Sequence, residues 1–189
     1  MKTKLKLIAV LLLISIITYG QDDSTSVSKQ IGITGLPIYY ISGGLNGNGF
    51  NGWALYGNYG WIFNQKNAIG LRPFWGSVNI GFFDDERLHS LGSNIYYRRY
   101  LSQDRWSFFV DANIGFGYIW YTSDVINNIS ENNGVMFNYA FGPGLNYEIK
   151  NNWNIEFLIQ YLQMRNISNP EGTTIGNTII PSIGIQKLF

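Results

Sequence analysis

The 189-residue sequence predicts an all-β fold, an eight-stranded antiparallel transmembrane β-barrel built as an up-and-down meander. Three observations predict it. Apolar and polar residues alternate with a period of two through most of the chain. Short polar turns alternate with longer connections. Beyond residue 20, no continuous apolar run is long enough to form a membrane-spanning helix.

The stretch from Trp106 to Trp120 shows the alternation most clearly. Its apolar face carries Trp106, Phe108, Val110, Ala112, Ile114, Phe116, Tyr118 and Trp120. A soluble barrel would have to bury this face, and similar faces of two other strands, in one small core. We therefore expect the face to contact lipid, with tryptophan at both membrane interfaces, where the indole ring is favoured.

The same period predicts eight strands along the chain. We expect them at Lys29–Ile41, Phe50–Phe63, Ala68–Phe82, Leu88–Leu101, Arg105–Tyr121, Val135–Ile149, Trp153–Arg165 and Asn177–Phe189. Three connections are tight and polar, as in hairpins, at Asn64–Asn67, Ser102–Asp104 and Lys150–Asn152. The longer connections are Ser42–Gly49, Phe83–Arg87, Thr122–Gly134 and Asn166–Gly176. Short turns therefore gather at one end of the barrel and long loops at the other.

The first 20 residues predict a cleaved secretory signal peptide, which leaves residues 21–189 as the barrel domain. Three lysines precede an apolar run from Leu7 to Ile17, and small residues follow near Gly20. The run is shorter than a comfortable membrane span.

Composition limits the other functions that are open to the chain. The formal net charge is +1, with no basic stripe of the kind that binds nucleic acid. The chain has no cysteine and a single histidine, so thiolate and histidine-rich metal sites are excluded. We expect neither a metal nor a cofactor.

The exported chain resembles the small OmpA-type outer-membrane β-barrels of Gram-negative bacteria. The resemblance covers residues 21–189 as a pattern, and its most specific feature is the terminal Phe189, which follows Ile183 and Ile185 on one face. It implies a bacterial outer-membrane location. It also implies that Phe189 is the signal read by the barrel assembly machinery. No periplasmic domain is expected, and the barrel is expected to be monomeric.

The inward face of the predicted barrel carries charges of both signs. By strand parity these are Arg72, Arg98, Asp111, Glu148 and Glu156. An eight-stranded barrel is just wide enough for its side chains to fill the interior, and buried charges persist when they are paired. We expect a salt-bridge network that plugs the half nearest the short turns. The alternative is a gated ion path.

Small residues gather on the inward face near the long loops. We expect Gly92, Gly115, Gly117 and Gly142 to line an upper cavity open to the outside. The alternative is that these glycines relieve strain in a tightly curved sheet or make room for a neighbouring ring.

His89, Ser90 and Glu86 are the candidates for catalysis. The outer-membrane lipid A deacylases share this architecture, with a motif similar to His-x-Ser that places both side chains on one face. Here His89 and Ser90 are adjacent, so they point to opposite faces, and Leu91 stands where the serine should be. The departure puts hydrolysis in doubt.

These observations predict an outer-membrane barrel with a structural, adhesive or surface-binding role, presenting four outer loops. Outer-membrane lipid and lipopolysaccharide are the expected partners, and a surface ligand or protein partner stays open. The alternatives are a lipid-modifying enzyme and a narrow channel.

Overall fold

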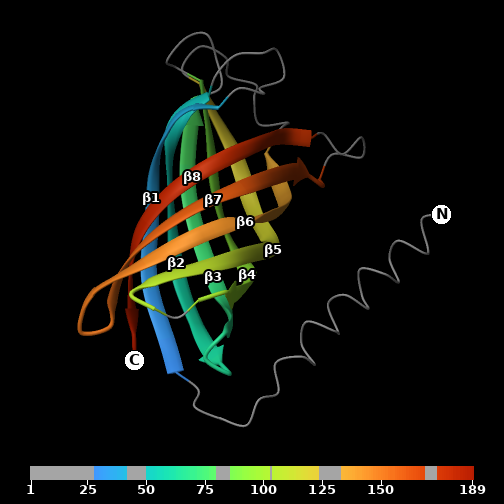
Figure 1. Ribbon diagram of the computed structural model, residues 1–189. Helices are drawn as coiled ribbons and strands as arrows, with labels where there is room; N and C mark the ends of the chain where they lie inside the picture. The colour runs from blue at the N-terminus through green and yellow to red at the C-terminus, as the bar shows by residue number, and fades with distance from the viewer. Residues whose placement is uncertain (1–27, 42–49, 80–85, 103, 124–132, 169–173) are drawn as a thin grey trace, which may run out of the picture.

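A computed structural model describes residues 28–41, 50–79, 86–102, 104–123, 133–168 and 174–189. These residues form a closed barrel of eight antiparallel strands in chain order, which confirms the predicted fold class (Figure 1). The predicted signal peptide lies outside the described residues. No helix within the described ranges is long and apolar enough to cross a membrane.

The strands follow the predicted positions closely. They are β1 (Ser28–Ile41), β2 (Phe50–Phe63), β3 (Asn67–Asn79), β4 (Glu86–Tyr100), β5 (Trp106–Ser123), β6 (Gly134–Lys150), β7 (Trp153–Asn166) and β8 (Thr174–Leu188). The largest difference among the described residues is that β8 begins three residues before the predicted Asn177, whereas the predicted end of the third strand at Phe82 lies outside the described residues.

Left-handed backbone closes two of the short turns. The β2–β3 turn has positive φ at Asn64 and Gln65, and the β6–β7 turn has it at Asn151 and Asn152. Asparagine tolerates this conformation better than most residues. Two successive positive φ angles also match the twist of the flanking strands. The C-terminus lies at this short-turn end (Figure 1).

The barrel is apolar outside and polar inside. Exposed large apolar side chains recur on alternate residues, as at Val110, Ile114, Phe116 and Tyr118 of β5, each about half exposed. The buried residues between them are largely polar, among them Asp111 and Asn113. Such an inside-out arrangement is stable when hydrocarbon surrounds the barrel, because the sheet is closed and leaves few backbone groups unpaired.

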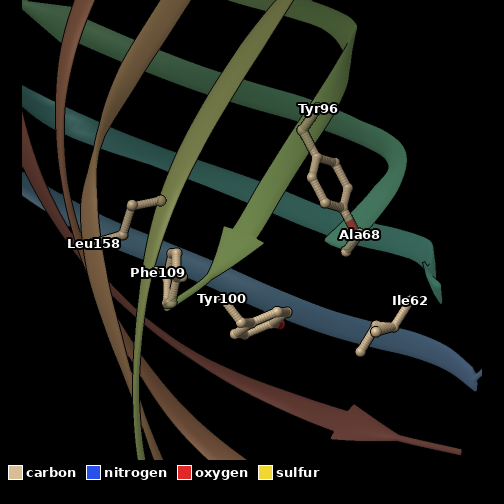
Figure 2. Packing of buried hydrophobic residues seen from close by; sticks show 6 residues of the cluster. All are labelled: Ile62, Ala68, Tyr96, Tyr100, Phe109 and Leu158. Atoms are coloured by element: carbon tan, nitrogen blue, oxygen red, sulfur yellow. The ribbon is translucent and has the colours of Figure 1, made fainter. Parts of the chain in front are cut away.

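One apolar cluster of the interior lies near the short turns. Ile62, Ala68, Tyr96, Tyr100, Phe109 and Leu158 form a buried cluster there. Figure 2 shows the rings of Tyr96, Tyr100 and Phe109 within the space that the strands enclose. Tyr100 and Phe109 meet edge to face, with ring centroids 5.8 Å apart. This packing supports the charged side chains that lie beside it.

Candidate functional site

Four charged side chains meet inside the barrel, in the half toward the short turns. We call Arg72, Arg98, Asp111 and Glu156 the plug. Arg72 donates from Nη1 and Nη2 to the two carboxylate oxygens of Asp111, at 2.8 and 2.9 Å. Arg98 donates from Nε to Asp111 Oδ2 at 3.0 Å and from Nη1 to Glu156 Oε2 at 2.5 Å. Two cations and two anions therefore compensate one another.

Each member of the plug comes from a different strand, and together they cross the interior. Arg72 lies on β3, Arg98 on β4, Asp111 on β5 and Glu156 on β7. All four are at most 2% exposed. Because charges removed from water are costly unless paired with good geometry, the two carboxylates hold both guanidinium groups in place.

Neutral polar side chains extend the plug to the remaining strands. Thr34 of β1 donates to Glu156 at 3.2 Å, and Arg72 Nε donates to Asn58 Oδ1 of β2 at 2.6 Å. Arg98 Nη1 lies 3.4 Å from Gln186 Oε1 of β8, which also accepts from Asn146 of β6. All eight strands thus contribute to one hydrogen-bonded network across the barrel.

Aromatic faces cover the guanidinium groups. The Cζ atom of Arg98 lies 3.9 Å from the ring centroid of Phe109, and that of Arg72 lies 4.7 Å from the Tyr96 ring. Cation–π contacts of this kind strengthen when water is excluded. Below them, Gln30 connects Tyr96, Tyr100 and Gln186 by hydrogen bonds. The short-turn half of the interior is therefore filled.

Glu148 was predicted to join this network and does not. It follows the inward parity of β6, but its side chain is exposed. The neighbouring strand β5 begins only at Trp106, which pairs with Tyr147, so Glu148 projects beyond the rim of the barrel. A register shift between Glu148 and Lys150 also ends the regular alternation there.

A cavity of about 50 Å³ lies on the side of the plug toward the long connections. Its walls combine amide and hydroxyl groups with apolar side chains, and none of its lining residues is charged. The polar lining residues include Ser90, Asn94, Asn113, Asn138, Gln160 and Ser182. Two amide groups have buried atoms without a hydrogen-bond partner, the Asn94 carbonyl oxygen and the Asn138 nitrogen.

The four glycines predicted to line an upper cavity do not line this one. Gly92 and Gly117 leave room for the Phe74 ring, since an added Cβ would lie 2.5 and 2.8 Å from its Cζ atom. At Gly115 and Gly142, an added Cβ would instead meet backbone carbonyl oxygens of the adjacent strand, at 2.2 and 1.8 Å. These glycines permit close packing of the wall and the ring, which is the alternative reading of the sequence.

The catalytic candidates are not brought together. His89 lies on the outer face, stacked on Trp120 with ring centroids 5.3 Å apart, and its Nε2 is 3.0 Å from Thr122 Oγ1. Ser90 lies on the opposite face and lines the cavity. The Glu86 side chain lies outside the described residues. A serine and a histidine on opposite faces cannot exchange a proton directly.

Aromatic residues form a girdle at each end of the outer face. Near the short turns, Trp106 packs on Tyr147 at 4.4 Å, and Lys187 lies 5.1 Å from the ring of the terminal Phe189. Toward the long connections, Trp53 packs edge to face on Trp75 at 4.8 Å. Phe189 is 60% exposed. The two girdles mark the interfaces of a membrane.

The fold, the apolar outer band and the girdles define the class of the protein. A closed eight-stranded barrel with an apolar exterior, aromatic girdles and a polar interior is the architecture of transmembrane β-barrels of the bacterial outer membrane. The chain belongs to that structural class.

A comparison with one solved structure agrees on the fold, and two further solved structures are similar over most of the chain. The crystal structure of Neisserial surface protein A is 11% identical with a TM-score of 0.51, over 88% of this chain and 100% of that one. Outer membrane protein OprG from Pseudomonas aeruginosa is 12% identical with a TM-score of 0.45, over 87% and 96%. Ail of Yersinia pestis is 15% identical with a TM-score of 0.39, over 88% and 100%. No family model matches the sequence, and no curated protein matches it. The narrower resemblance to OmpA-type barrels stays a prediction.

Strand parity pointed to the charged residues of the plug but not to their neutral partners. Gln30, Thr34, Asn58, Gln160 and Gln186 all face inward, but so do many other polar residues. Which of them form hydrogen bonds with one another depends on the tilt of the strands, and the tilt cannot be read from the sequence. Among the described residues, no group of three or more histidine or acidic side chains could hold a metal ion.

Proposed function

We propose that the protein is a closed outer-membrane barrel that acts through its outward-facing surface and not as a channel. One observation carries this proposal: the plug joins Arg98 to Asp111 and Glu156 across the interior, with every member at most 2% exposed. A path for ions would have to break these pairs.

Planar-bilayer recording tests the closed interior. We expect no conductance steps from the wild-type protein. The double substitution Arg98→Ala and Glu156→Ala removes a cation and an anion together, opens space in the plug and should give measurable steps. Glu148→Ala, at the exposed rim, should stay as silent as the wild type. Steady conductance by the wild-type protein would overturn the proposal.

We propose that the end with the long connections faces the cell exterior and contacts lipopolysaccharide. Arg87 at the start of β4 and Arg165 near the end of β7 are exposed there. Cations at a membrane surface attract the phosphate groups of anionic lipids. Lipopolysaccharide in the vesicles should raise the unfolding midpoint of the wild-type protein. The substitutions Arg87→Gln and Arg165→Gln together should reduce that rise. An equal rise in the double variant would count against this contact.

We propose that Phe189 is the residue read by the barrel assembly machinery. Its backbone pairs with that of Lys29 at 3.1 and 2.8 Å, while its ring stays exposed on the outer face. Phe189→Ala should lower the amount of folded barrel in cells. It should leave refolding of the purified protein into detergent unchanged, because refolding in detergent needs no machinery. Equal loss in both assays would indicate a purely structural role.

A further inference from the structure

The seam that closes the barrel, between β1 and β8, is paired over only part of its length. The ladder has six residue pairs, from Gln30–Leu188 to Gly35–Ile183. Beyond it, β1 continues to Ile41 on β2, and β8 reaches back to Thr174 on β7. In the described residues, the two strands are therefore unpaired with each other toward the long connections. Figure 1 shows β8 diverging from β1 toward that end.

Two prolines explain where the seam ends. Continuing the register two residues past Gly35–Ile183 brings Pro37 opposite Pro181. Lys29 and Phe189 exchange both backbone hydrogen bonds, and in an antiparallel ladder such pairs recur at every second residue. Pro37–Pro181 therefore falls on a position where both residues should donate across the seam. Neither can, because proline has no backbone N–H.

The same geometry explains why the prolines leave the other ladders intact. At this position the backbone nitrogens of the two prolines, which carry no hydrogen, face the β1–β8 seam and not β2 or β7. Accordingly, Pro37 keeps its pairing with Trp53 of β2, and Pro181 keeps its pairing with Ile159 of β7. The interruption is confined to one seam of the barrel wall.

The interrupted seam lies beside the cavity. Ile180 and Ser182, the residues on either side of Pro181, both line it. Pro181 itself is exposed on the outer face between Ile179 and Ile183, which are 65% and 49% exposed. At this point of β8, the wall between the cavity and the membrane has no backbone pairing with β1.

Two polar atoms of the cavity lining have no hydrogen-bond partner. The Asn94 carbonyl oxygen needs a donor, and the Asn138 amide nitrogen needs an acceptor. Buried polar groups without partners are costly, so their presence at one cavity points to an occupant. Because no lining residue is charged, that occupant is neutral.

We propose that the Pro37–Pro181 interruption is a lateral opening through which the cavity binds a neutral amphiphile from the membrane. The ligand class is a single alkyl chain with a hydroxyl or amide head. The head enters the cavity, where it donates to Asn94 and accepts from Asn138. The chain passes between β1 and β8 into the hydrocarbon.

Photolabelling tests the proposal with a long-chain alcohol that carries a diazirine on its chain. The wild-type protein, in lipid nanodiscs, should be labelled on β8 around Ile180 and on the facing part of β1. In the double variant Pro37→Val and Pro181→Val, two backbone hydrogen bonds can form across the seam. Labelling there should fall about tenfold, a change of the size that two such bonds produce. Pro143→Val, a matched exchange in β6 away from the seam, should leave labelling unchanged.

Two further measurements keep the outcome decisive. Amide exchange at Thr178–Ile180 should slow in the double variant, which shows that the seam has closed in a folded barrel. An alkyl carboxylate and an alkylammonium of equal chain length should compete less well than the alcohol. Undiminished labelling of a variant whose amides are protected would overturn the opening. Equal competition by the charged analogues would overturn the ligand class and leave the cavity with water only.

Discussion

Asp111 is the side chain on which the interior depends most. It is fully buried and accepts hydrogen bonds from both arginines of the plug and from Gln160 Nε2 at 2.9 Å. Replacing both partners of a buried pair with apolar groups can be tolerated, whereas removing one partner leaves an uncompensated charge. Asp111 faces two cations, so its loss leaves both arginines short of a partner.

Asp111→Asn should therefore lower the free energy of unfolding by about 3–5 kcal/mol, the cost of breaking a buried ion pair. Urea titration in lipid vesicles, followed by tryptophan fluorescence, measures it. Glu148→Gln makes the same chemical change at the exposed rim and should shift stability by less than about 0.5 kcal/mol. Similar losses in the two variants would contradict the role given to the plug.

Strand parity predicted four plug members because a charged side chain at an inward position of a narrow barrel is buried and persists there when it is paired with an opposite charge. Arg72, Arg98, Asp111 and Glu156 all satisfy that argument. Parity failed at Glu148, because it cannot tell where the adjacent strand begins. It also could not assign the glycines, since one small inward residue serves equally for a cavity or for a neighbouring ring.

At the scale of the strands, the close approach of β6 and β7 is a feature that only the structure shows. An added Cβ at Gly142 would lie 1.8 Å from the carbonyl oxygen of Ile159, a backbone atom that cannot rotate away. At Gly35, in β1, the nearest atom to an added Cβ is a Leu55 methyl carbon at 3.4 Å. Gly142 shares the buried face of β6 and Gly35 the outer face of β1, and only at Gly142 would an added Cβ overlap a backbone atom.

Gly142→Ala should destabilise the barrel by about 1–3 kcal/mol or more, as expected when atoms are forced into a packed region. Gly35→Ala serves as the control and should change stability by less than about 1 kcal/mol. The shift in heat-modifiable gel mobility with urea concentration measures both. If Gly142→Ala unfolds at the wild-type midpoint, the close approach of the two strands is wrong.

Strand positions were predictable because a period of two persists across each strand and turns interrupt it. The exact start of β8 was not, since pairing extends only as far as the partner strand does. The interruption of the β1–β8 seam could not be predicted from the sequence either. Pro37 and Pro181 stand far apart in the chain, and only the register of the closed barrel brings them opposite each other.

At the scale of the whole molecule, the stability of the barrel depends on the hydrocarbon around it. Ile114 lies at the middle of β5 and is 52% exposed, whereas Ile149 lies near the end of β6 and is 48% exposed. In water, arginine at either position would be harmless. In a bilayer, its cost depends on depth.

Ile114→Arg should lower stability by about 2–4 kcal/mol, and Ile149→Arg by about 0–1 kcal/mol, the costs at the midplane and near an interface. Both are measured by unfolding in vesicles. Two nearly neutral substitutions would indicate that the outer face meets water.

The most direct measurement is an accessibility scan along β5 in lipid vesicles. The chain has no cysteine, so single cysteines from Ser107 to Ile119 can each carry a spin label without background. Oxygen, which concentrates in hydrocarbon, should relax the labels at Phe108, Val110, Ala112, Ile114, Phe116 and Tyr118 strongly. Labels at the positions between them should respond weakly, in a period of two. If a water-soluble nickel complex instead reaches the Phe108–Tyr118 set, the outer face is wet and the membrane-spanning barrel is contradicted.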